Sequence, residues 1–126
     1  MPALPDEVRH AWKDRDGQPA ILATVAPDGT PNIIYVNCWS LYGGDRVVIA
    51  DNFFNKTKAN IMAGSKGALL FRRSDGTPYQ IKGSFEYHTE GEVYDDMKRW
   101  NPAGKPGRAA AAIVAEEVYS RAERLL

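Results

Sequence analysis

The sequence predicts a small, mainly β protein: a barrel of five or six antiparallel strands with short helices. Several segments of strand length are rich in apolar, β-branched and aromatic residues. Turn dipeptides such as Asp-Gly and Gly-Gly separate many of them, and the segments with helical character are few and short. A chain of 126 residues is expected to form one domain, residues 1–126.

The N-terminal half is expected to begin with a helix and continue as three strands. Pro5-Asp6-Glu7 is typical of a helix start, and this helix should extend to about Asp14. Strands are predicted at 20–26, 31–42 and 46–50, with turns at 27–30 and 43–45. Tight turns between successive strands predict an antiparallel meander.

The middle of the chain predicts a helix followed by a hairpin. The helix begins at Asn55 and runs to about Met62. Strands are predicted at 66–73 and 79–88, on either side of a turn at 74–78. Gly83 lies inside the second strand and indicates a bulge or bend.

The last part of the chain predicts a helix at 92–100 and a loop at 101–107, which reads N-P-A-G-K-P-G. Residues 109–120 are compatible with either helix or strand, because four alanines favour helix and the residues after them favour neither. A nearly closed antiparallel sheet needs one more strand, and this favours a strand through about Tyr119.

Composition narrows the function classes. Sixteen basic residues balance sixteen acidic ones, which argues against a nucleic-acid partner. A single cysteine excludes an intramolecular disulfide, and no segment has the pattern of a membrane span or a signal peptide. A cytoplasmic location is therefore expected, without membrane association. The two histidines and one cysteine form no metal-binding motif, so no metal is predicted.

The segment 52–63 has the features of an anion site. An apolar strand ends at Asp51, and a helix begins at Asn55 with Lys56 and Thr57 in its first turn. The first N–H groups of a helix lack internal partners and carry partial positive charge, so a lysine and a hydroxyl beside them predict a phosphate site. Asn55 is the predicted N-cap, with its side chain bonded to a helical N–H.

Three segments together resemble a known family. They are A-T-V-A-P-D-G-T-P-N at 23–32, V-V-I-A-D-N-F-F-N-K-T-K-A-N at 47–60 and K-G-S-F-E-Y-H-T-E-G at 82–91. They resemble the FMN-binding split-barrel superfamily, the pyridoxamine 5′-phosphate oxidase-like group, and in particular its small bacterial FMN-binding proteins. The resemblance implies a six-stranded antiparallel Greek-key split barrel and a homodimer that holds FMN at the subunit interface.

The resemblance also implies which residues bind the flavin. Lys56 and Thr57 would hold its phosphate, with Asn55 beside it. The strand end and turn at 50–53 would run along the flavin. The long second strand, 31–42, would border it at Asn37, Cys38 and Trp39, and an aromatic residue of the partner subunit, with Trp100 as the candidate, would cover it. The remaining candidates are Asn37, Cys38, Trp39, Ala50, Asp51, Asn52, Phe53 and Trp100. Core packing is the alternative for Trp39 and Trp100, and a small buried side chain is favoured over a nucleophile for Cys38.

The functional expectation is an FMN-dependent oxidoreductase or electron carrier. Its electrons would come from a nicotinamide or from a redox protein. The chain lacks the C-terminal substrate segment of the true oxidases, so the sequence does not predict oxidation of pyridoxamine phosphate. The alternative is a non-catalytic module that binds or senses FMN, a deazaflavin or another phosphorylated ligand.

Overall fold

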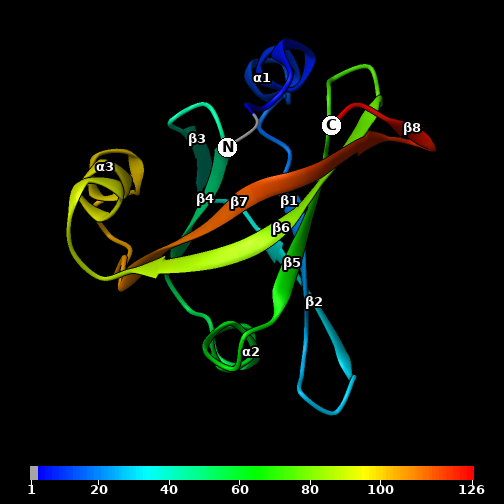
Figure 1. Ribbon diagram of the computed structural model, residues 1–126. Helices are drawn as coiled ribbons and strands as arrows, with labels where there is room; N and C mark the ends of the chain where they lie inside the picture. Colours follow the sequence, from blue (N-terminus) through cyan, green and yellow to red (C-terminus); the bar gives the residue numbers. More distant parts are fainter. Residues whose placement is uncertain (1–2) are drawn as a thin grey trace.

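The computed structural model describes residues 3–126 as one antiparallel sheet with three short helices around it (Figure 1). The helices are α1 (Asp6–Lys13), α2 (Lys56–Met62) and α3 (Glu92–Trp100). The strands are β1 (Ala20–Val25), β2 (Pro31–Val36), β3 (Trp39–Tyr42), β4 (Arg46–Asp51), β5 (Lys66–Arg72), β6 (Pro78–His88), β7 (Ala109–Ser120) and β8 (Glu123–Arg124). The mainly β class and the three helices predicted from the sequence are confirmed.

The strand order shows that the sheet curls into a barrel. It is β2-β1-β5-β6-β7-β4-β3, and β8 pairs with β7. β2 and β3 lie at opposite ends of this order, yet only Asn37 and Cys38 separate them in the chain. Three Cα–Cα steps span at most about 11 Å, so the two ends of the sheet must meet there. No ladder joins β2 to β3 among the described strands, and the barrel is therefore split at Asn37-Cys38.

Two expectations about the N-terminal strands are wrong. The segment 31–42 is two strands rather than one, because β2 pairs with β1 as far as Val36 whereas β3 pairs with β4 from Trp39 onward. The predicted meander is wrong for the same reason: the structure has two separate hairpins, β1–β2 and β3–β4. The split strand and the short β8 raise the strand count to eight, where the sequence predicted five or six.

The centre of the sheet agrees with the sequence. Residues 109–120 form the strand β7, which pairs with both β4 and β6. The register between β6 and β7 shifts between Lys82 and Gly83, which confirms the predicted bulge. A Cβ atom at Gly83 would lie 1.8 Å from the carbonyl oxygen of Val114, so only glycine fits in this position.

The core has two parts, one on each side of β4 and β7. One fills the barrel and is covered by α1 through Val8 and Ala11. In the other, α3 packs through Val93 and Met97 against small side chains of β4 and β7, Ala50, Ala110 and Ala112 among them. Alternate residues of a strand face opposite sides, so β7 serves both parts: Ala110 and Ala112 pack toward α3, whereas Ile113 and Ala115 belong to the core of the barrel.

None of the helices within residues 3–126 has the length and apolar character needed to cross a membrane.

Candidate functional site

A cavity of about 300 Å³ opens where the barrel is split. It is formed by β2, the Asn37-Cys38 connection, the end of β4 and the turn after it, and the loop at 101–107. Its lining residues are Ile34, Tyr35, Val36, Asn37, Cys38, Ala50, Asn52, Phe53, Phe54 and Lys105. Five residues predicted to bind a cofactor are thus brought together: Asn37, Cys38, Ala50, Asn52 and Phe53. We call this space the split cavity.

A second cavity, of about 330 Å³, adjoins the split cavity. Asn37 and Cys38 line both spaces. The other residues that line the second cavity are Trp12, Arg15, Trp39, Ser40, Trp100 and Pro102. Two more predicted residues, Trp39 and Trp100, therefore lie here. Trp39 is also 97% buried and packs in the core, its ring centroid 5.1 Å from that of Phe71, as the core-packing alternative for this residue predicted. We call this space the tryptophan cavity.

Asp51 does not line either cavity. Its side chain is fully buried and accepts hydrogen bonds from the backbone N–H of Phe54, at 3.0 Å, and from the hydroxyl of Tyr87. Desolvation and the neighbouring carboxylate raise the pKa of Tyr87, which keeps its hydroxyl protonated as the donor. Because its side chain is occupied in this way, Asp51 shapes the turn that leads from β4 to α2.

Two asparagines connect the turn after β4 to the loop at 101–107. The side-chain amides of Asn52 and Asn101 bond reciprocally, at 3.0 and 2.9 Å, and the Asn52 oxygen also accepts the N–H of Gly107 at 2.9 Å. Both side chains are buried. The loop is thereby held against the split cavity, and its Lys105 ammonium lies 5.3 Å from the ring centroid of Phe53.

Lys105 is a site residue that the sequence reasoning missed. It is the only charged residue in the loop at 101–107, and it stands between glycine and proline. A single lysine in an otherwise uncharged loop was the only local sign in the sequence that Lys105 could take part in the site. Its place beside the split cavity depends on the pairing of Asn52 with Asn101, 49 positions apart, which no local pattern indicates.

The predicted phosphate residues lie next to the split cavity but do not line it. Helix α2 begins at Lys56, two residues after Phe54, which does line it. Lys56 is exposed. Thr57 is buried, and its Oγ1 accepts a hydrogen bond of 3.0 Å from the Asn32 side chain, so the hydroxyl hydrogen remains available for a ligand.

The predicted side-chain cap by Asn55 is wrong. Asn55 occupies the N-cap position with φ −131° and ψ −84°, and its side chain bonds to no helical N–H. The carboxylate of Asp51 accepts the N–H of Phe54 instead. The exposed Asn55 side chain therefore takes no part in capping the helix.

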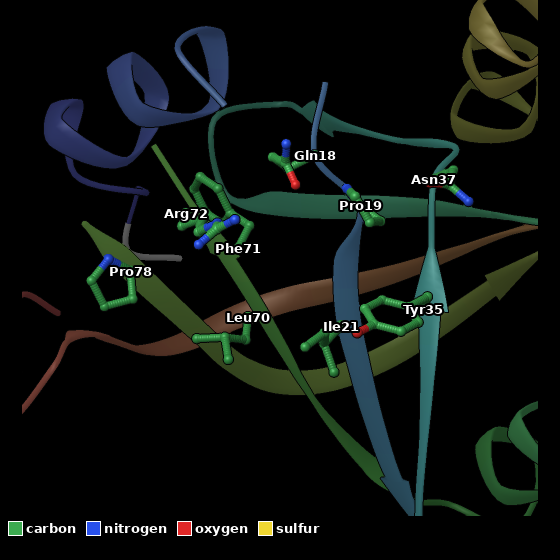
Figure 2. A pocket seen from close by; sticks show the side chains of 9 residues that line it. All are labelled: Gln18, Pro19, Ile21, Tyr35, Asn37, Leu70, Phe71, Arg72 and Pro78. Atoms are coloured by element: carbon green, nitrogen blue, oxygen red, sulfur yellow. The ribbon is translucent and has the colours of Figure 1, made fainter. Parts of the chain in front are cut away.

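A third cavity, of about 550 Å³, is a depression on the outer surface of β1 and its neighbours (Figure 2). Leu70, Ile21 and Tyr35 form a row across β5, β1 and β2. Tyr35 and Asn37 line both this depression and the split cavity. The apolar surface of β2 therefore continues to the edge of the candidate site.

Comparison with known proteins agrees with this architecture. The pyridoxamine 5′-phosphate oxidase family matches residues 4–122. An uncharacterized protein of Methanocaldococcus jannaschii is 34% identical over 113 residues, which are 86% of this chain and 76% of that protein.

Two solved structures illustrate the similarity of fold. HupZ of Group A Streptococcus superposes with a TM-score of 0.77 at 25% identity, covering 89% of this chain and 91% of HupZ. An FMN-binding protein from Syntrophomonas wolfei has a TM-score of 0.71 at 20% identity, covering 90% and 94%. With the family match over nearly the whole chain, these findings show that the protein belongs to the pyridoxamine 5′-phosphate oxidase-like superfamily of FMN-binding split barrels.

Proposed function

We propose that the protein is an FMN-binding flavoprotein that acts in redox chemistry, with the flavin in the split cavity. One observation carries the proposal. Asn37, Cys38, Ala50, Asn52 and Phe53, which the family resemblance assigned to the flavin from two separate segments, line one cavity together. When bound, FMN supplies one- and two-electron transfer, and the protein contributes binding, orientation and electrostatics.

The start of α2 is the proposed phosphate site. A phosphate brings about two negative charges at neutral pH. Lys56 is exposed and free to turn toward it, and the Thr57 hydroxyl, already accepting from Asn32, has its hydrogen to donate. Lys56 and Thr57 lie two and three residues after Phe54 in the chain, so a ligand with its ring in the split cavity and a flexible chain to its phosphate suits the arrangement.

A homodimer is the proposed assembly, with the outer surface of β2 in the interface. Ile33 and Tyr35 on β2 are 69% and 73% exposed, and Phe53 beside the split cavity is 68% exposed. Large apolar side chains gathered at one surface favour burial by a partner. A second copy seated there would also cover the split cavity, which would exclude water from the flavin.

Two uses of the flavin remain to be separated. As an oxidoreductase or electron carrier, the protein would take electrons from a nicotinamide or a redox protein. As a binding or sensing module, it would hold FMN, or a deazaflavin in its place, without turnover.

The absorbance spectrum of the purified protein tests the proposal. A flavin spectrum, or its appearance with added FMN, supports the FMN site, whereas a deazaflavin has a different spectrum. Bleaching by NADH or NADPH without oxygen supports the reductase, and a flavin that no donor reduces favours the binding module. A colourless protein that takes up no added FMN contradicts the proposal. Size-exclusion chromatography with light scattering tests the dimer, which a monomeric mass would refute.

A further inference from the structure

The tryptophan cavity gathers every tryptophan of the chain around one arginine. The chain has three tryptophans, and Trp12, Trp39 and Trp100 all line this cavity with Arg15. They come from α1, β3 and α3, and Figure 1 shows β3 between these two helices in the view drawn. Aromatic walls with a guanidinium among them suit a planar ligand that carries negative charge.

Arg15 has most of its hydrogen-bonding capacity unused. Its guanidinium carbon lies 4.4 Å from the ring centroid of Trp12 and 5.3 Å from that of Trp39. Of its five N–H groups, the described chain engages one, in a 2.5 Å bond to the backbone oxygen of Trp12. No carboxylate within residues 3–126 forms an ion pair with the Arg15 guanidinium. The carboxylate next to it in sequence, Asp14, pairs with Arg73 at 3.4 Å.

The electrostatics of Arg15 favour an anion. Desolvation lowers the pKa of its guanidinium from the ordinary value, so the charge is held at a cost in hydration. An anion close to it would offset that cost, since opposite charges interact more strongly where water is partly excluded.

One of the tryptophans that line the cavity also has an unused hydrogen-bond donor. The indole N–H of Trp12 is buried and has no hydrogen-bond acceptor among the described residues. The indole of Trp100, by contrast, donates to the carboxylate of Asp96 at 3.3 Å. Buried donors are normally satisfied in proteins, so this unpaired N–H is an unusual feature of a residue that lines the cavity.

We propose that the tryptophan cavity binds a small planar molecule carrying an oxyanion, a carboxylate or a phosphate, and that Arg15 binds the oxyanion. Asn37 and Cys38 form the wall that this cavity shares with the split cavity. The bound molecule therefore lies beside the proposed flavin and is its substrate; this last assignment rests on the proposed function, whereas the binding site does not.

Tryptophan fluorescence measures this binding directly, because no tryptophan of the chain lies elsewhere. The purified protein is titrated with benzoate, with phenyl phosphate and with the neutral analogue benzamide. We expect a saturable change with benzoate or phenyl phosphate, whichever oxyanion the cavity takes, and weaker binding of benzamide. Arg15→Gln should weaken binding of that anion by about tenfold or more, and Arg15→Lys should retain part of it.

Arg124→Gln is the matched control. Arg124 also stacks on an aromatic ring, that of Tyr119 at 5.9 Å, and donates to a backbone oxygen, that of Leu126 at 2.9 Å, but it lies on β8. The Arg124→Gln substitution removes the same charge as Arg15→Gln, and the Arg124→Gln variant should bind the anion as the wild type does. Circular dichroism confirms that each variant is folded.

The outcomes separate this inference from the proposed function. Saturable binding that is lost in Arg15→Gln supports the site even if the protein takes up no FMN, which would refute the flavin proposal alone. Equal binding by folded Arg15→Gln and the wild type, equal binding of benzamide, or no saturable signal with either anion would overturn the inference, whatever the protein does with FMN.

Discussion

The two hydrogen bonds between the side-chain amides of Asn52 and Asn101 should contribute strongly to the stability of the fold. Replacing Asn101 with alanine removes two hydrogen bonds, from Asn52 Nδ2 and to Asn52 Oδ1. The Asn52 oxygen keeps its bond to the N–H of Gly107, but the Asn52 Nδ2 group is left buried without a partner in the described chain.

The magnitude follows from these contacts. An unsatisfied buried donor costs about 1–3 kcal/mol, and the loss of the second hydrogen bond adds about 1 kcal/mol. Asn101→Ala should therefore lower the free energy of unfolding by about 2–4 kcal/mol, a large part of the stability of an ordinary domain. Asn52→Ala should cost at least as much, because it also removes the acceptor of Gly107.

Urea unfolding followed by circular dichroism measures these values. Asn55→Ala is the control, because the Asn55 side chain is exposed and caps nothing; it should change stability by less than about 0.5 kcal/mol. The double variant Asn52→Ala/Asn101→Ala should cost less than the sum of the single changes, since both remove the same pair. An Asn101→Ala variant as stable as the wild type, or as mildly affected as Asn55→Ala, would refute the reasoning.

Three further changes test other parts of the molecule. Lys56→Ala should weaken FMN binding about 10- to 150-fold in a flavin titration while leaving the unfolding midpoint unchanged, because it removes one charged hydrogen bond from an exposed side chain; unchanged affinity would remove Lys56 from the site. Gly83→Ala should lower the free energy of unfolding by about 3 kcal/mol, since its Cβ would overlap the Val114 carbonyl; a mild effect in urea unfolding would show that the bulge can shift. Arg46, bonded to Glu86 at 2.9 Å, holds the pKa of that carboxyl below its ordinary 4.5. Glu86 thus adds stability above that value and loses its contribution as pH falls through the lowered pKa, so Glu86→Gln should lose less stability than the wild type between about pH 6 and pH 3; equal losses would contradict the assignment.

The correct predictions came from local pattern in one case and from the needs of the whole sheet in another. Gly83 within an alternating segment indicated the bulge, and the need for one more strand correctly favoured a strand for the alanines of β7. The break at Asn37 was not visible, because apolar and β-branched residues continue on both sides of it and the change of pairing partner is a property of the whole sheet.

The candidate site was predictable to a similar degree. Family-like segments identified Ala50 and Asn52, which do line the split cavity. The same reasoning could not show that the Asp51 carboxylate accepts a hydrogen bond from Tyr87. Nor could it show that the bond between Asn52 and Asn101 holds the loop with Lys105 against the split cavity. Contacts between residues 36 and 49 positions apart determine those roles, and no local sequence pattern reveals them.

The position of β4 in the sheet has a consequence for how the chain folds. β4 is almost wholly buried, and apart from its hairpin with β3 it pairs only with β7, where Ala50 faces Ala110, 60 positions later. During synthesis, the edge of β4 that pairs with β7 stays uncovered until the last third of the chain has been made. Pairing between such distant segments slows folding, and until β7 is made the unpaired edge of β4 is prone to aggregation. A nascent chain that stops before β7 would therefore be a natural client for chaperones, however stable the finished barrel is.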